Sequence, residues 1–223
     1  MHDPGPAERP LEPFRWLGHA ALLLHAPETL VVDPWRGRAA GAGARAALVT
    51  HAHGDHCDED DLDAACGADA PVLAPPAAAA RLARRLGQRL VAVQAGDTRR
   101  VAGCDVTVLP AAGPLRRGRA SGFLPPGSGA AYLVAGAAFR ALVLGDSRVL
   151  AEHEGLAPDL AFVAVGGLVT ATPEEAADDV ARLGARCVVP VHWGDLEGRH
   201  VDAQRFAALC AARGVVARVP GAR

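Results

Sequence analysis

The stretch of sequence that decides the fold is residues 46–56, which read AALVTHAHGDH. Its first five residues predict a short buried strand. Four potential metal ligands follow directly: His51, His53, Asp55 and His56. Alternate residues of an extended chain point the same way, so the first two histidines can share one ion. The chain then turns at Gly54, and the other two ligands can face a second position. Imidazole and carboxylate groups suit Zn²⁺ and related divalent ions, so the stretch predicts a metal centre.

Two other strands predicted from apolar runs also end at candidate ligands. Residues 139–144 lead to Asp146, and residues 187–191 lead to His192. Residues just beyond the ends of core strands are held by a rigid scaffold and can converge on one point, where binding and catalytic groups commonly lie. We therefore add Asp146 and His192 to the predicted metal centre.

These three segments resemble the motifs of a known family. HAHGDH at 51–56 resembles the HxHxDH motif of the metallo-β-lactamase superfamily. LGDS at 144–147 resembles its later GD(T/S) element, and VPVH at 189–192 resembles its terminal strand and histidine. The order of the three segments along the chain is also that of the family.

Finer features resemble one branch of this superfamily, the ascorbate-6-phosphate-lactonase-like metal-dependent hydrolases. They are WLGHA at 16–20, VDP at 32–34, DLAF at 159–162, GG at 166–167 and the helix start within 170–177. The likeness runs from about residue 14 to residue 195. It implies an α/β (α+β) fold, a four-layer αββα sandwich with the metals at one edge of the paired sheets.

The resemblance also implies a role for each ligand. The first metal would be held by His51 and His53, the second by Asp55, His56 and His192, and both by a bridging Asp146. A water between two such ions becomes hydroxide near neutral pH, because metal binding lowers its pKa from 15.7 towards about 7. Asp55, which could orient that hydroxide, and Asp146 are therefore the catalytic candidates. The expected cofactor is Zn²⁺, as one or two ions, with Mn²⁺ or Fe²⁺ as alternatives.

The sequence departs from the family at one ligand. The family has another first-metal histidine after the strand that ends here at Pro110, but residues 111–114 read AAGP, and no histidine lies between His56 and His153. Three outcomes stay open: two metals with a weakened first position, the second metal alone, or no metal. His153 or Cys104 could substitute, although no spacing argument supports either.

Composition narrows the function classes. The chain has 223 residues, half of them apolar, which is enough for one sizeable core, so we predict a loose leader at 1–12 and one domain at 13–223. The formal charge of −2 gives no reason to expect nucleic acid, and no polybasic or long apolar tract suggests a membrane. The N-terminus lacks a signal-peptide pattern, and the five scattered cysteines form no CxxC pair. We therefore expect a cytoplasmic protein that has reduced thiols and acts on a small-molecule substrate. The protein could form a homo-oligomer.

Periodicity and turn signals predict the remaining elements. The expected strands are 14–25, 29–33, 71–74, 89–94, 99–110, 130–135, 159–165 and 215–219, and the expected helices are 77–86, 172–184 and 202–213. The segment 111–129 contains five glycines and three prolines and is predicted to be a long loop. Long loops of this kind in compact domains are often functional.

Three residues are candidates for substrate contact. His19 matches a recurrent position in the branch, Trp193 adjoins His192, and Arg116 begins an arginine-rich run that includes Arg117 and Arg119. Arginine forks match phosphate and carboxylate groups, so an anionic substrate is one hypothesis. The plainer interpretations are a structural histidine, a packing tryptophan and a solvated loop.

Two hypotheses of function follow. The first is a metal-dependent hydrolase that uses a metal-bound hydroxide on a small ester, lactone, amide or phosphoester, with an atypical first metal site. The alternative is a degenerate member of the same fold with one metal or none, acting as a ligand-binding or non-hydrolytic protein. One fold hosts many activities, so the substrate class rests on analogy alone.

Overall fold

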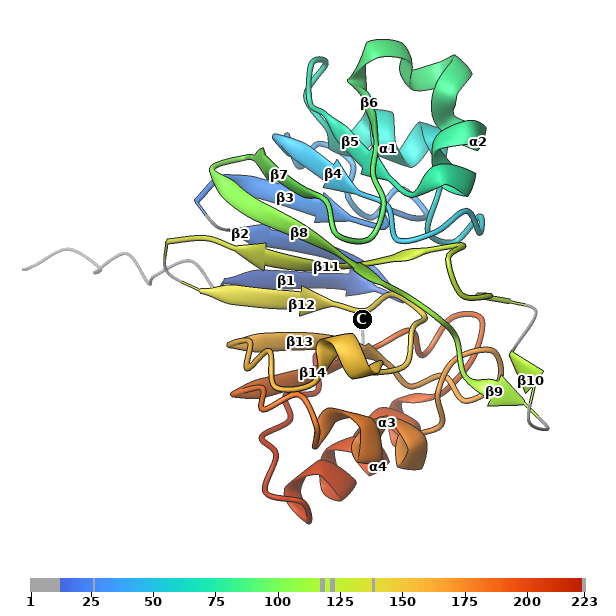
Figure 1. Ribbon diagram of the computed structural model, residues 1–223, viewed down its shortest axis with the longest axis vertical. Coiled ribbons are helices and arrows are strands. Elements are labelled where there is room, and N and C mark those ends of the chain that lie inside the picture. The colour runs from blue at the N-terminus through green and yellow to red at the C-terminus, as the bar shows by residue number, and fades with distance from the viewer. Residues whose placement is uncertain (1–12, 26, 117–118, 121–122, 138, 222–223) are drawn as a thin grey trace, which may run out of the picture.

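The computed structural model describes residues 13–25, 27–116, 119–120, 123–137 and 139–221. Two six-stranded sheets form the middle of the molecule, and helices lie outside them (Figure 1). Helices α1 (Glu59–Ala65) and α2 (Pro76–Leu86) belong to the side of the first sheet, and α3 (Pro173–Val180) and α4 (His200–Ala211) to the side of the second. This is the predicted four-layer αββα arrangement. The leader predicted at 1–12 lies outside the described residues.

The first sheet has the order β1-β2-β3-β4-β5-β6. Its strands are β1 (Phe14–Gly18), β2 (Ala21–His25), β3 (Thr29–Val32), β4 (Ala46–Leu48), β5 (Val72–Ala74) and β6 (Leu90–Ala92). Strands β1 to β3 are antiparallel, and β3 to β6 are parallel. Side chains alternate across a strand, so Leu22 and Leu24 pack between the sheets while Ala21 and Leu23 pack with α1 and α2.

The second sheet has the order β14-β13-β12-β11-β8-β7. Its strands are β7 (Thr98–Val101), β8 (Cys104–Pro110), β11 (Ala130–Ala135), β12 (Arg140–Val143), β13 (Leu160–Ala164) and β14 (Cys187–Val191). The two sheets meet in one apolar cluster, in which the Phe14 ring packs edge-on against Phe162 at 5.0 Å. The buried hydroxyl of Tyr132 donates to the Val49 carbonyl at 2.8 Å and so links β11 to the end of β4.

Several predicted elements differ from the structure. The runs 14–25 and 99–110 were each expected as one strand, but each is a hairpin, because the chain turns with positive φ at His19 (51°) and at Ala102 (49°). The predicted helix 172–184 ends at Val180. The strand predicted at 215–219 is a single bridge between Ala217 and Val188. The predicted loop 111–129 contains the short strands β9 (Leu115–Arg116) and β10 (Arg119–Ala120), which pair beyond the sheet edge (Figure 1).

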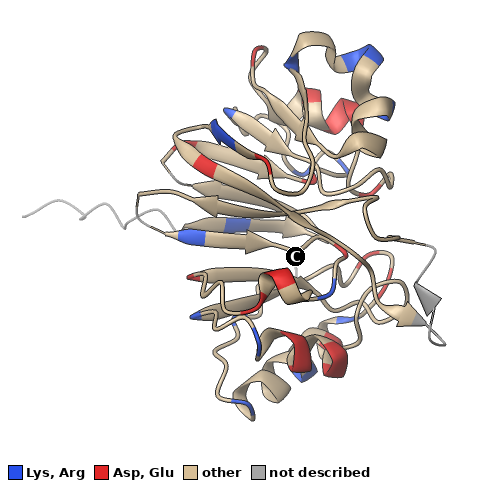
Figure 2. Ribbon diagram, in the orientation of Figure 1, with Lys and Arg blue, Asp and Glu red and all other residues tan. Residues whose placement is uncertain are grey.

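Charge and cysteine placement agree with a compact polar exterior. Figure 2 shows acidic and basic residues on the helices, loops and strands of the described part of the chain. All five cysteines are free thiols, and three of them are buried. None of the helices in the described ranges has the length and apolar character needed to cross a bilayer.

Candidate metal centre

All six predicted ligands meet at one edge of the sandwich, just past the ends of β4, β12 and β14. Strand β4 of the first sheet and the parallel strands β12, β13 and β14 of the second end on this edge, so residues that are distant in sequence come together there. The ligands are His51, His53, Asp55 and His56 after β4, Asp146 after β12, and His192 after β14. Four of the six are almost fully buried: His51, His56, Asp146 and His192.

The ligand atoms form two groups. In the second position, His56 Nε2 lies 3.4 Å from Asp55 Oδ2, and His192 Nε2 lies 3.5 Å from the same oxygen. The two imidazole nitrogens face each other at 3.2 Å. In the first position, His51 Nε2 lies 2.9 Å from His53 Nδ1.

Asp146 spans both groups. Its Oδ1 lies 3.2 Å from both His56 Nε2 and His192 Nε2, while its Oδ2 lies 3.6 Å from His51 Nε2. The Oδ1 atom is buried and accepts no hydrogen bond from any described residue. The two oxygens of one carboxylate thus face the two groups, which is the geometry that a bridging ligand requires.

The spacing of these atoms fits a bound cation. Ligands of a tetrahedral zinc at about 2.0–2.2 Å from the ion are about 3.3–3.6 Å apart. In the second position, the distances given above between the imidazole nitrogens and the carboxylate oxygens, and between the two nitrogens, are 3.2–3.5 Å. Imidazole nitrogens and carboxylate oxygens that converge on one buried point are costly unless protons or a cation lie between them, so the arrangement fits a divalent cation in both chemistry and spacing.

Charge in the cluster points the same way. Burial alone would raise the pKa of Asp146 and Asp55, but the surrounding imidazoles outweigh it and hold the pKa of each carboxyl well below its ordinary value. Burial opposes protonation of His192, yet Asp146, Asp55 and Glu197 raise its pKa to about 9. The pKa of His51 falls to about 3, chiefly through burial and then through His56, so its imidazole stays neutral. Against the effect of burial, Asp146 and Asp33 raise the pKa of His56 well above its ordinary value. The two carboxylates thus stay ionised around the place where a cation would sit, and a bound cation would take over the role of the protons that His56 and His192 hold.

Two buried carboxylates orient the histidines from behind. Asp33 Oδ2 accepts from His56 Nδ1 at 2.7 Å, and Glu197 Oε1 lies 2.8 Å from His192 Nδ1. Both contacts are made on the Nδ1 side of the ring, so Nε2 of each histidine faces the ligand cluster, as in the usual support for a metal-bound histidine. Sequence reasoning did not single out either residue as part of the site. Asp33 carried a signal, because it directly follows a buried strand, whereas Glu197 carried none.

Thr50 connects the Asp33 support to the first position. Its amide and hydroxyl donate to the two Asp33 oxygens at 2.8 and 2.7 Å, and its hydroxyl oxygen accepts from His51 Nδ1 at 3.0 Å. Gly145, at the end of β12, approaches this hydroxyl so closely that a Cβ there would lie 2.8 Å from it. The φ angle of Gly145 is 56°, so a side chain would be strained as well as crowded.

Glu197 also holds a loop of the site. It accepts from the amides of Leu168 and Val169 at 2.8 Å and from the Thr170 hydroxyl at 2.7 Å. We expect Glu197→Gln to weaken metal binding about 10- to 100-fold, because the amide nitrogen faces donors instead of accepting from them. Competition with a zinc chelator measures the change. Glu174→Gln, a partly exposed position on α3 that pairs with Arg205, is the control. Equal affinities in the two variants would contradict the role of Glu197.

The position of the missing histidine is ordered but offers no ligand. Ala112 follows β8 and exchanges hydrogen bonds with Ser147, next to Asp146, so this segment lies beside the centre. His153 cannot replace the histidine, because its Nε2 lies 2.9 Å from the Pro110 carbonyl and its Nδ1 accepts from the Leu150 amide. Cys104 lies at the opposite end of β8. Within the described part of the chain, the first position thus has two imidazoles and Asp146.

The predicted substrate contacts are placed differently. His19 is fully buried, and its Nε2 donates to Asp55 Oδ2 at 2.8 Å. Trp193 is buried against Trp16, with ring centroids 4.7 Å apart. Neither is among the residues that line the pocket at the metal centre. In this structure His19 positions Asp55 and Trp193 packs, and a contact of either with substrate stays a prediction. Only the backbone of Arg116 and Arg119 is described, and Arg117 lies outside the described residues.

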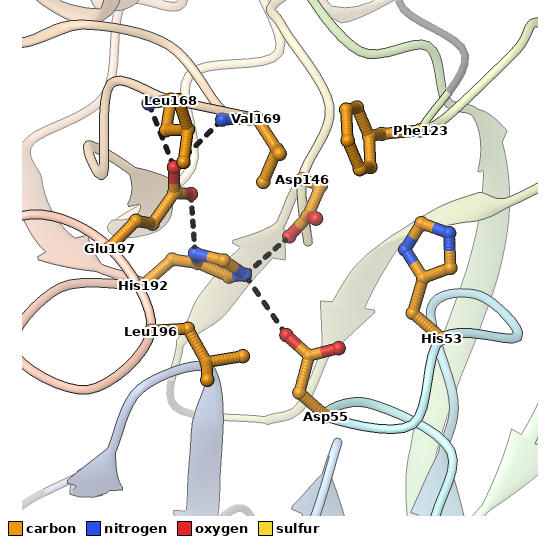
Figure 3. A pocket seen from close by; sticks show the side chains of 9 residues that line it. All are labelled: His53, Asp55, Phe123, Asp146, Leu168, Val169, His192, Leu196 and Glu197. Carbon is orange, nitrogen blue, oxygen red and sulfur yellow. Dashed lines mark hydrogen bonds and ion pairs between the residues drawn. The ribbon is translucent and has the colours of Figure 1, made fainter.

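A pocket of about 280 Å³ opens onto the centre (Figure 3). Its polar residues include His53, Asp55, Asp146 and His192, and its other lining residues are Phe123, Leu168, Val169, Leu196 and Glu197. Figure 3 shows the carboxylates and imidazoles facing one another across this space, with Phe123 and the two leucines around them. A small molecule can therefore reach four of the six predicted ligands directly.

Comparisons with known proteins agree with the fold. The family model described as "Beta-lactamase superfamily domain" matches residues 2–193. A UPF0173 metal-dependent hydrolase from Methanoregula boonei is 30% identical over 205 residues, which are 86% of each chain. A crystal structure of a Parabacteroides distasonis protein matches with a TM-score of 0.80 at 22% identity, over 94% of this chain and 93% of that one. CmlA, a diiron β-hydroxylase from Streptomyces venezuelae, matches with a TM-score of 0.65 at 18% identity, over 92% of this chain and 52% of that one.

Proposed function

We propose that this chain, which belongs to the beta-lactamase superfamily domain family and is a metal-dependent hydrolase, cleaves a small ester, lactone, amide or phosphoester at a centre with two unequal metal positions. The observation that carries the proposal is the convergence of six side chains from three strand ends, four of which line one pocket. Divalent cations held there would lower the pKa of a water and polarise the carbonyl or phosphoryl oxygen of the substrate.

The side chains around the pocket have different proposed roles in the reaction. Asp55 stays ionised, and His19 holds its Oδ2 at 2.8 Å. Figure 3 shows the other Asp55 oxygen pointing away from His192, where it can accept a hydrogen bond from the attacking water and orient it. Asp146, fixed beneath the pocket, holds the two positions at a constant separation. Glu197 keeps His192 and the loop at 168–169 in place, so little reorganisation is needed when a substrate enters.

The two positions differ in their ligands. The second has Asp55, His56, His192 and one Asp146 oxygen, and each imidazole there has a carboxylate behind it. The first has His51, His53 and the other Asp146 oxygen. We propose that the second position binds tightly and that the first is weaker and exchangeable. The donor set of imidazole and carboxylate suits Zn²⁺ best, with Mn²⁺ and Fe²⁺ as alternatives.

Reconstitution tests this function. The purified protein is stripped with chelator, reloaded with Zn²⁺, and assayed with a nitrophenyl ester, a lactone, an anilide and phosphate mono- and diesters. We expect at least one class to be hydrolysed by the loaded protein, with the rate lost on stripping and restored on reloading. The double variant His51→Ala/His192→Ala controls for hydrolysis by free zinc and should regain nothing. A folded protein that retains no metal, or turnover that survives stripping, would contradict the proposal.

A further inference from the structure

The mouth of the pocket collects exposed apolar side chains. Six large apolar residues are strongly exposed among the described ones: Leu115, Phe123, Leu168, Leu196, Val201 and Val216. Three of these six line the same pocket, although they come from segments far apart in the sequence. Single exposed apolar side chains are ordinary on a protein surface, but a cluster around a concave site marks a place where ligand is bound.

The walls and the floor of this pocket have opposite character. Phe123, Leu168, Val169 and Leu196 form the apolar side of the lining, while the polar side comes from four predicted ligands, His53, Asp55, Asp146 and His192. No arginine is among the described residues that line it. The Glu197 carboxylate is occupied, since it accepts from two amides and a hydroxyl and contacts His192. Polar recognition is therefore available at the reacting centre, and the surrounding wall offers only apolar contact.

Charged and aromatic contacts hold the wall in place. Leu168 and Val169 are fixed through their amides by Glu197. Leu196 follows Asp195, whose two carboxylate oxygens accept hydrogen bonds from the two terminal nitrogens of Arg38 at 2.8 and 2.7 Å. The Phe123 ring lies edge-on to His53, with centroids 6.4 Å apart. A wall ordered before ligand arrives binds with less loss of entropy than a loose one.

From this wall we propose that the substrate is a neutral carboxylic ester or lactone with an apolar acyl chain, and that Phe123, Leu168 and Leu196 select it by enclosing that chain. The inference rests on the proposed hydrolase function and narrows its substrate class. In the reaction the oxygen of water bonds to the acyl carbon, the bond from that carbon to the alcohol oxygen breaks, and a proton from water ends on the alcohol.

A chain-length series tests the selection. Nitrophenyl esters from acetyl to octanoyl are assayed with the zinc-loaded protein, and the matching carboxylates, from acetate to octanoate, are titrated by calorimetry. We expect kcat/KM and carboxylate affinity to rise roughly two- to fourfold for each methylene until the pocket is full. Leu168→Ser and Leu196→Ser should each lower the octanoyl-to-acetyl ratio by about tenfold. Val216→Ser, equally exposed but outside the pocket, should leave the ratio unchanged.

The possible results distinguish a failure of the proposed apolar selection from a failure of the proposed hydrolase function. Hydrolysis without any dependence on chain length, or a preference for an acyl chain of the same length that ends in a carboxylate, would overturn the apolar selection and leave the hydrolase intact. If no ester, lactone, amide or phosphoester is hydrolysed, the proposed function fails, and the carboxylate titration still decides whether the pocket prefers apolar chains. Equal losses in Leu168→Ser and Val216→Ser would also overturn the inference.

Discussion

Asp146→Ala should lose at least about a thousandfold in kcat/KM and should also bind less metal. Asp146 is the one described side chain whose two oxygens face both groups of imidazoles, at 3.2 Å on one side and 3.6 Å on the other. Alanine would remove a ligand from each position at once and leave the first with two imidazoles. It would also remove the carboxylate that keeps the two positions together, so positioning and charge stabilisation fail in the same variant.

Turnover and zinc per chain, measured on the same preparation, test this effect. Asp105→Ala, an exposed carboxylate on β8 that pairs with Arg100, is the matched control and should behave as the parent protein does. Asp146→Asn keeps the shape and one acceptor oxygen and should fall between the two. Circular dichroism establishes that the alanine variant is folded. Normal turnover in folded Asp146→Ala would rule out the proposed mechanism.

Much of the centre could be predicted because its ligands follow short apolar runs. A buried strand must be apolar, and polar residues directly after it stand out, as His51 and His192 do. The start of helix α3 could also be predicted from its capping residues. Thr172 accepts from the Glu175 amide at 3.2 Å, and the Glu175 side chain accepts from the Thr172 amide at 2.9 Å.

The supporting residue Glu197 could not be predicted, because its partners are distant in sequence. Glu197 acts through loop contacts with residues near 168–170, and no local pattern marks such a pairing. The turn at His19 was missed for a different reason. A non-glycine residue with φ of 51° is rare, so sequence signals favoured a continuous strand through 14–25. The φ of His192 is 60°, and that of Asp33 is 43°, so unusual backbone conformations gather at this centre, as they often do at functional sites.

His192→Ala and His51→Ala should have unequal effects on metal binding. We expect His192→Ala to weaken the tighter of two metal equivalents by more than about a hundredfold, because it removes a ligand and leaves the Glu197 carboxylate buried without its imidazole partner. His51→Ala should leave that equivalent in place and lose only the weaker one. Its position already lacks the third histidine, because Ala111, Ala112 and Gly113 follow β8 where the family places that ligand.

Titration of the stripped proteins with Zn²⁺ against a chromogenic chelator resolves the two equivalents. The parent protein should show a tight and a weak phase, His51→Ala the tight phase alone, and His192→Ala no tight phase. His200→Ala, a histidine at the start of α4 outside both ligand groups, controls for general effects of removing an imidazole. If the two ligand variants lose the same phase to the same extent, the positions are equivalent and the assignment of a strong and a weak site is wrong. If His51→Ala instead loses the tight phase, the order of the two positions is reversed, and the missing histidine is not what limits the first.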